Sequence, residues 1–235
     1  MKKQPNLQHN RMIALNLLLG VFIAIGGLCY DTILHNLVMK TIASSGFVAL
    51  CAINLNYGLK SQKGLRAQDR EKFAYIMLAA FAFCLLADIV LEIEFMYGAL
   101  IFAVGHVCFL FAYCRLAAVK IKDFMPSLII FALAAPIILF VSLFDFGGTL
   151  MQMVCLFYAL IISLMLGKAI SNYRRRPEAA TLCILVGSCM FFFSDFMLLF
   201  EQFAEVPSII GSLCVNSYYP AQAVLAHSVY RAGLK

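Results

Sequence analysis

The 235-residue sequence has few charged residues, and this deficit narrows the class of protein. Only 13% of the residues are Asp, Glu, Lys or Arg, whereas 63% are hydrophobic. A soluble domain is nearer one quarter charged and one half apolar, so this chain has too little polar surface to cover a water-soluble globule. We therefore expect an integral membrane protein.

Several motifs of established chemistry are also absent. The sequence contains no G-x-S-x-G, H-E-x-x-H, P-loop or G-x-G-x-x-G, which argues against a serine triad, a zincin-type site and a nucleotide-binding loop. The nine cysteines lie in apolar runs without a C-x-x-C pair or a Cys/His ligand spacing. We expect buried thiols, no disulfide framework, no metal site and no cofactor.

Long apolar runs dominate what is present. A helix needs about 20 apolar residues to cross the hydrocarbon core of a bilayer. Eight runs meet that requirement: residues 12–30, 37–57, 73–92, 96–115, 124–143, 148–170, 179–200 and 206–230. The sequence predicts an all-α membrane protein with eight transmembrane helices, which form a single domain over residues 1–235.

The basic residues give this bundle an orientation. All of the 18 Lys and Arg residues except Lys40 lie in the terminal segments or near the ends of even-numbered spans, and these positions share one side. The positive-inside rule makes that side cytoplasmic and places both termini there. Because the clusters are short, we interpret them as orientation signals and expect no nucleic-acid partner. The sequence predicts a multi-pass protein of the cell's inner or plasma membrane.

An aspartate recurs within two of the apolar runs. Asp88 and Asp195 are 107 residues apart, and each is followed by a leucine after three positions and a glutamate after six. Both lie on helices expected to run outward. This pattern predicts a parallel four-plus-four internal repeat, with halves of about 1–120 and 121–235.

The depth of the two aspartates makes them candidate catalytic residues. Each lies six residues before its glutamate, hence roughly 9 Å below it along a helix. An ionised carboxylate facing lipid there would cost several kcal/mol, so Asp88 and Asp195 are expected to face the bundle interior. Two neighbouring acids can hold one proton between them, as general acid–base catalysis requires. Alternatively, they only join neighbouring helices by hydrogen bonds.

Other polar residues of the spans are candidates for binding a substrate in the same cavity. They are Lys40, His106, Tyr113, Asn216, Tyr218, Tyr219 and Gln222. For Lys40 the alternative is a side chain that reaches the lipid head groups. For the histidine and the tyrosines, the alternative is a hydrogen bond between helices or plain packing.

One segment resembles a known family. "FCLLADIVLEIEFMYGALIFAVGHVCFLFAY" resembles the YhhN family, which pairs an Asp near the end of one span with a G-x-x-x-F-x-x-x-H segment on the next, here Gly98, Phe102 and His106. "FFFSDFMLL" and "YYPAQ" are similar to its later S-D and Y-x-A-Q segments, and Lys40 falls where the family tends to have a lysine. The proline before Ala-Gln departs from the pattern and leaves the exact substrate open.

The resemblance implies a lysoplasmalogenase activity. Such enzymes cleave the vinyl ether bond of a lysophospholipid to a fatty aldehyde and a glycerophospho-alcohol, and Asp88 and Asp195 would do this work. The expected partners are the lysophospholipid and membrane lipid, and the oligomeric state stays open. A proton- or cation-coupled transporter and a non-catalytic lipid-binding protein are the alternatives. A continuous proton path is disfavoured because the inner half of the spans has few matching acids.

Overall fold

The structure, a computed structural model, describes residues 7–61 and 67–234. Five cations of the predicted basic clusters lie outside the described residues: Lys2, Lys3, Lys63, Arg66 and Lys235. The described residues form eight α-helices and one short 3₁₀-helix, and no strand occurs among them. The elements are α1 (Leu7–Thr32), α2 (Leu37–Ser61), α3 (Ala67–Leu91), α4 (Phe95–Leu116), η1 (Ile121–Asp123), α5 (Phe124–Phe140), α6 (Thr149–Arg175), α7 (Ala179–Phe203) and α8 (Ile209–Gly233).

The predicted all-α architecture is confirmed, and seven of the predicted spans are confirmed as candidates for crossing a membrane. Among the described residues, the segments from α1 through α7 are long and apolar enough to do so. The last helix, α8, has 25 residues but does not reach the same hydropathy. It can be more polar because fourteen of its residues are buried. The crossing of α8 stays a prediction.

The outer surface of the bundle is apolar. Leu17 on α1 is 66% exposed and Leu133 on α5 is 69% exposed, and many other large apolar side chains on these helices are also uncovered. A helix that is apolar on the side facing its surroundings is stable in lipid, because exposing apolar surface to hydrocarbon carries no free-energy penalty. These helices therefore fit a hydrocarbon solvent.

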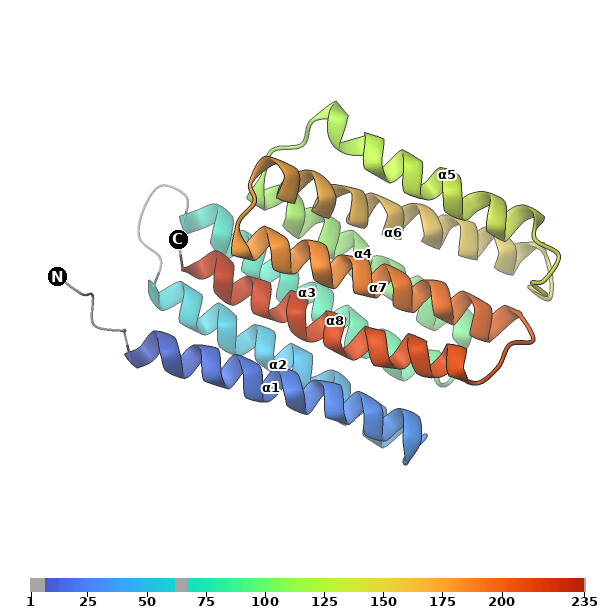
Figure 1. Cartoon of the computed structure of the whole chain (residues 1–235), viewed down its shortest axis with the longest axis horizontal. Helices are drawn as coiled ribbons and strands as arrows, with labels where there is room; N and C mark the ends of the chain where they lie inside the picture. Colours follow the sequence, from blue (N-terminus) through green and yellow to red (C-terminus); the bar gives the residue numbers. More distant parts are fainter. Residues whose placement is uncertain (1–6, 62–66, 235) are drawn as a thin grey trace.

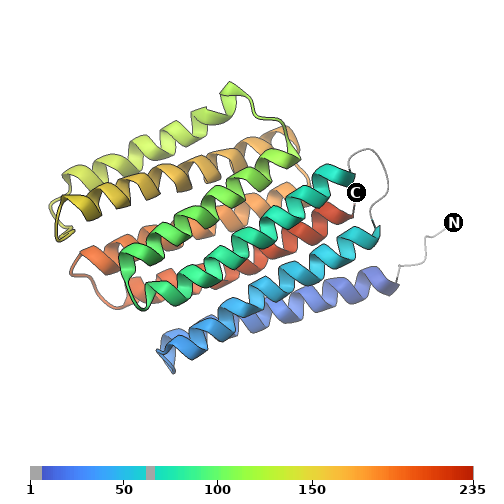
Figure 2. The ribbon, with the colours of Figure 1, turned by 180° about the vertical axis from the view of Figure 1, so that it is seen from behind.

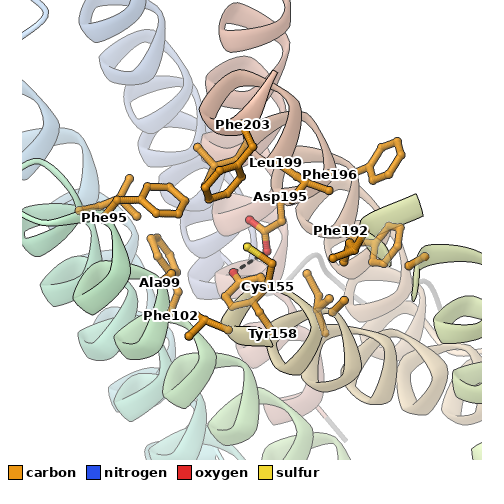
Figure 3. Close-up of a pocket in the computed structure, with 17 residues that line it drawn as sticks. Phe95, Ala99, Phe102, Cys155, Tyr158, Phe192, Asp195, Phe196, Leu199 and Phe203 are labelled. Carbon is orange, nitrogen blue, oxygen red and sulfur yellow. Dashed lines mark hydrogen bonds between the residues drawn. The ribbon is translucent and has the colours of Figure 1, made fainter. Parts of the chain in front are cut away.

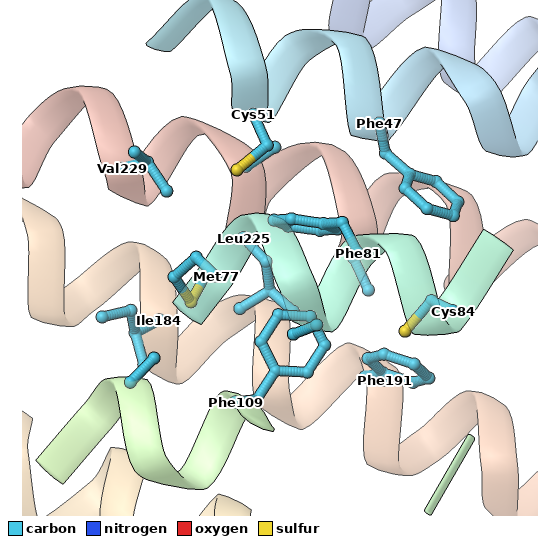
Figure 4. Close-up of a cluster of buried hydrophobic side chains, with 14 of the residues drawn as sticks. Phe47, Cys51, Met77, Phe81, Cys84, Phe109, Ile184, Phe191, Leu225 and Val229 are labelled. Atoms are coloured by element: carbon cyan, nitrogen blue, oxygen red, sulfur yellow. The ribbon is translucent and has the colours of Figure 1, made fainter. Parts of the chain in front are cut away.

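Apolar side chains from five helices, four of which contribute a phenylalanine ring, form the centre of the bundle (Figure 4). Phe47, Phe81, Phe109 and Phe191 come from α2, α3, α4 and α7, and all four are fully buried. Their ring centroids follow one another at 5.7, 5.2 and 6.2 Å. Leu225 of α8 packs in the same cluster. This core joins the first half of the chain to the second.

The helices pack in a pattern that repeats between the two halves. In the first half α1 packs on α2, α2 on α3 and α3 on α4, and in the second half α5 packs on α6, α6 on α7 and α7 on α8. Across the halves, α4 packs on α6 and α2 on α8, and α1 and α3 also pack on α8. The helices α1 and α5 lie at opposite edges of the bundle in both views (Figures 1 and 2). The two aspartate-bearing helices, α3 and α7, each pack on the preceding and the following helix of their own half.

The two ends of the bundle differ in charge. The helix α1 begins and α8 ends at the same end of the bundle (Figure 1). The loops between α1 and α2, α3 and α4, α5 and α6, and α7 and α8 lie at the other end, which we call the acidic end. Six carboxylic residues lie at or near it: Asp31, Glu92, Glu94, Asp145, Glu201 and Glu205.

The contact between α3 and α4 depends on Gly98. A Cβ atom added there would lie 2.6 Å from the Cα and 2.7 Å from the backbone nitrogen of Leu91. Gly98→Ala should therefore push α4 away from the end of α3, and overpacking of this kind costs about 1–3 kcal/mol. We expect a lower thermal unfolding midpoint in detergent. Gly20→Ala is the control, because its new Cβ would meet Ala223 at an ordinary 3.8 Å. Equal midpoints for the two variants would contradict this account.

Candidate active site

A polar cavity of about 700 Å³ opens within the acidic end. Its walls come from α1, α2, α3, α4, α7 and α8, and from the loops that follow α1, α3 and α7. Asp88 of α3 and Asp195 of α7 both line it. The two aspartates that the sequence singled out therefore face one shared space, although they lie in different halves of the chain.

Asp88 is held by two hydroxyl groups. Asp88 is buried, with only 2% of its surface exposed. Ser44 of α2 donates a hydrogen bond to Asp88 Oδ2 at 2.5 Å, and the Tyr218 hydroxyl of α8 donates to the same oxygen at 2.8 Å. The neighbouring Tyr219 hydroxyl lies 3.4 Å from Ser44 Oγ. Hydroxyl donors of this kind suit a carboxylate acceptor.

Asp195 belongs to a closed triangle with Tyr158 and His106. The Tyr158 hydroxyl of α6 donates to Asp195 Oδ2 at 2.8 Å, and His106 Nε2 of α4 lies 3.1 Å from the same oxygen. The third side, between His106 Nε2 and the Tyr158 hydroxyl, measures 2.7 Å. The histidine is fully buried, whereas the Asp195 side chain is 11% exposed. Both partners of Asp195 can carry a proton, so a proton can be exchanged within this triangle.

The partners of the two aspartates come from corresponding helices. In each half, the aspartate accepts a hydrogen bond from the second helix of its own half: Ser44 on α2 and Tyr158 on α6. Its other partner comes from the fourth helix of the opposite half: Tyr218 on α8 and His106 on α4. The chemistry of the partners differs, because only Asp195 contacts an imidazole.

Lys40 and Glu92 form an ion pair at the wall of the cavity. Lys40 Nζ lies 2.7 Å from Glu92 Oε1, and the Tyr30 hydroxyl donates to the same oxygen at 2.6 Å. Partial burial alone would raise the pKa of Glu92, but the hydrogen bonds from Lys40 and Tyr30 outweigh it and lower that pKa below its ordinary value. The lysine nitrogen also lies 5.4 Å from the centre of the Tyr30 ring. Lys40 is therefore held at the cavity wall by a carboxylate and a ring.

The lowered pKa of Glu92 has a consequence for stability. A depressed carboxyl pKa contributes stability above the unfolded-state pKa, and the contribution is lost as pH falls through the folded-state pKa. Glu92→Gln should lower the unfolding midpoint at neutral pH. The difference from the unaltered protein should shrink as pH falls through and below the ordinary glutamate range of about 4.3. Midpoints measured in detergent across this range test it, and a difference independent of pH would contradict it.

The mouth of the cavity carries further carboxylates. Asp31 and Glu201 both line it. Ser212 donates to Asp31 Oδ1 at 3.2 Å, and Asn216 donates to Asp31 Oδ2 at 3.1 Å. Gly211 allows the close approach of α8 to α7, because an added Cβ would collide with the Glu201 carboxylate. At the mouth, Asp31 therefore already has two hydrogen-bond partners on α8.

The structure brings some of the predicted binding residues to the cavity and leaves others away from it. Lys40, Tyr218 and Tyr219 line it together with the two aspartates. His106 and Asn216 do not line the cavity themselves, but each contacts an aspartate that does. His106 contacts Asp195, and Asn216 donates to Asp31.

The remaining two predicted binding residues, Tyr113 and Gln222, neither line the cavity nor form a described hydrogen bond with a residue that lines it. Tyr113 lies deeper, where its hydroxyl pairs with Ser188 Oγ at 3.0 Å. Gln222 is fully buried on α8. Both therefore belong to the interior of the bundle.

Sequence reasoning missed Ser44 and Tyr158, which are direct partners of the aspartates. Each lies within a largely apolar run, and nothing local to it predicts which helix it faces. The packing order shared by the two halves offers a signal. Asp88 has a partner on α2, the second helix of its half. The corresponding helix of the other half is α6, so a partner of Asp195 should be sought there, and Tyr158 is the tyrosine within the apolar run of α6.

A second pocket, narrow and apolar, adjoins the polar cavity at Asp195 (Figure 3). It has a volume of about 80 Å³ and lies between α4, α5, α6 and α7. Five residues line both spaces: Leu91, Phe95, Phe102, Asp195 and Leu198. Tyr158 lines the apolar pocket and donates to Asp195 there. The carboxylate of Asp195 therefore lies on the border between a polar and an apolar space.

The fold and the site define a polytopic helical membrane protein with a cavity whose five carboxylic residues include Asp88 and Asp195. Residues 36–229 match the YhhN family, and the chain belongs to that family. The match extends from the residues before Lys40 to the last turns of α8, so it includes both aspartates and all of their partners. No curated protein and no solved structure matches the chain significantly.

Proposed function

We propose that this protein hydrolyses the vinyl ether bond of lysoplasmalogen-type lysophospholipids, releasing a fatty aldehyde and a glycerophospho-alcohol. The observation that carries the proposal is the single cavity lined by Asp88 and Asp195 in a protein of the bilayer. Membership of the YhhN family, which includes lysoplasmalogenases, supports it. The reaction needs a proton donor, a stabilising anion and water, and the residues present can supply the first two.

The first chemical step is protonation of carbon. A proton adds to the vinyl carbon beta to the ether oxygen, and the π electrons form the new C–H bond, leaving an oxocarbenium ion. We assign the donor role to Asp195, because His106 and Tyr158 can return a proton to it after each turnover. Asp88 stabilises the cation as a carboxylate, since Ser44 and Tyr218 donate hydrogen bonds to it.

The second step consumes one water. The water oxygen attacks the carbon bonded to the ether oxygen, and a carboxylate accepts the proton that the water loses. The resulting hemiacetal then collapses. Its hydroxyl group loses a proton as the carbonyl forms, the bond between that carbon and the glycerol oxygen breaks, and the glycerol oxygen takes up a proton. One lysoplasmalogen and one water thus give one aldehyde and one alcohol, without oxidation or reduction.

The arrangement of the cavity suits a lysophospholipid that enters from one leaflet. The lining residues come from the acidic end of the bundle, where Lys40 can share its charge between Glu92 and a lipid phosphate. A cavity at one end favours binding and reaction over transport along a continuous path. We further propose that the opposite, basic end faces the cytoplasm, as the positive-inside rule implies.

The internal repeat is part of the same proposal. We infer that residues of about 1–120 and 121–235 are parallel repeats within a single domain. The matching order of helix packing in the two halves supports this inference, as does the matching origin of the partners of each aspartate. A two-fold arrangement explains why a catalytic pair would be built from one aspartate of each half.

Release of aldehyde by purified protein tests the proposed function. The protein in detergent is incubated with a lysoplasmalogen and, separately, with its saturated alkyl-ether analogue. We expect aldehyde from the vinyl ether and none from the analogue, because only the vinyl ether can be protonated on carbon. Absence of aldehyde with every head group tried would overturn the proposal, and flux measurements in proteoliposomes would then test transport.

A further inference from the structure

The apolar pocket beside Asp195 is lined almost entirely by hydrocarbon side chains. Small side chains open it, with Ala134 from α5 and Cys155 and Ala159 from α6. Phe192 and Phe196 of α7 line it as well (Figure 3). Its only described carboxylate is that of Asp195, at the border with the polar cavity. A space of this composition excludes a phosphate or a sugar and admits methylene groups.

The pocket extends to a level deeper than Asp195. Two of its residues lie about one helical turn deeper than the Tyr158–Asp195 hydrogen bond, in the direction away from the acidic end. They are Ile162, one turn after Tyr158, and Phe192, one turn before Asp195. On α5 the pocket extends from Ile138 to Ala134, which lies one turn further from the acidic end than Ile138. A chain that starts at Asp195 and runs past these residues would be enclosed over its first few methylene groups.

Aromatic contacts lie beside the pocket at the acidic end of the bundle. They join the segment between α5 and α6 to α7: Phe144 packs edge-on against Phe200 with ring centroids 5.0 Å apart, and Phe146 lies against Phe203 at 4.8 Å. Phe203 itself lines the pocket. Apolar rings therefore continue from the pocket towards the acidic end.

We propose that the pocket between α4, α5, α6 and α7 binds the first methylene groups of the alkenyl chain and so places the vinyl ether bond at Asp195. This inference rests on the proposed function, because it names the position of that substrate. In a lysoplasmalogen the vinyl ether joins the polar glycerophosphate to the apolar chain. The border between the polar cavity and the apolar pocket has the same order, and Asp195 lies on it.

A photoactivatable lysophospholipid locates the chain without requiring turnover. The probe is a saturated alkyl-ether lysophosphatidylcholine with a diazirine a few carbons from the ether oxygen, used on the full-length protein. We expect competable labelling of Cys155, Ala159 or Ile162 in α6. Labelling confined to outward-facing residues such as Leu133 and Phe157, which are 69% and 55% exposed, would overturn the proposal. This mapping needs no variant.

A matched pair of variants on α5 tests the same pocket. Ala134→Phe should fill its deep end, lower competable labelling at least fivefold and lower kcat/KM for a 16-carbon alkenyl chain at least tenfold. Ala132→Phe is the control, because Ala132 lies on the exposed face of α5 and outside the pocket. Equal effects of the two substitutions would overturn the proposal.

The outcomes separate this inference from the proposed function. If the photoprobe labels residues inside the pocket but the protein releases no aldehyde, the chain site is supported and the hydrolysis is refuted. Aldehyde release with labelling only outside the pocket would support the hydrolysis and refute the chain site.

Discussion

Asp195→Asn is expected to lower kcat for vinyl ether cleavage by about 10²–10⁴-fold, the usual contribution of a positioned general acid. The amide keeps the size of the side chain, and its oxygen can still accept the hydrogen bond that the Tyr158 hydroxyl donates. What it lacks is a transferable proton next to His106. The fall should therefore appear in kcat, while binding of the alkyl-ether photoprobe stays within about twofold of the unaltered protein.

The control for Asp195→Asn is Asp145→Asn. Asp145 is a carboxylate of the acidic end that accepts a hydrogen bond from the Gly147 backbone and does not line the cavity. Its replacement should leave kcat within about twofold. Full activity of Asp195→Asn in a folded protein would refute the role of Asp195 as the proton donor.

Asp88→Asn is expected to lower kcat by about 10²–10³-fold, because a buried anion that stabilises a developing cation is removed. Ser44 and Tyr218 can still donate to the amide oxygen, so the local geometry should persist. The loss should again lie in kcat and leave probe binding intact. Measurements of kcat and KM at several pH values, with circular dichroism to verify the fold, test this expectation.

Glu92→Gln is the matched control for Asp88→Asn. It removes an equal charge from the same cavity, about one turn further along the chain from Asp88. Because Glu92 pairs with Lys40 and contacts no proposed reacting atom, its replacement should act on KM and leave kcat within a few-fold. Equal losses of kcat in both variants would mean that the total charge of the cavity matters, and that Asp88 has no special role.

The helices and the inward orientation of Asp88 and Asp195 could be predicted from the sequence because both signals are local. Apolar runs of about 20 residues define spans, and an acid within such a run is conspicuous. The prediction was least secure at α8, whose polar residues lower its hydropathy. Those residues are tolerated because α8 packs against α1, α2, α3 and α7. Burial by neighbouring helices is a property of the whole bundle, so the run of residues 206–230 does not reveal it.

The partners of the aspartates were harder to predict, because they depend on how the helices face each other. His106 was proposed as a cavity residue, but it supports Asp195 from behind. Tyr113 lies on the same helix two turns deeper, and its pairing with Ser188 removes it from the cavity. Tyr158 gave no local signal, since one tyrosine in an apolar run can equally pack or bind. Rotation of each helix about its axis decides these cases, and composition does not encode it.

Turnover in D₂O tests the central claim most directly. The protein cleaves a lysoplasmalogen in deuterated buffer, the aldehyde is reduced at once to the alcohol with borohydride, and mass spectrometry counts the deuterium. Protonation on carbon predicts one deuterium at carbon 2 of the released chain, formed by the unaltered protein and lost with the activity in Asp195→Asn. Aldehyde without deuterium at carbon 2, or no aldehyde at all, would contradict the account.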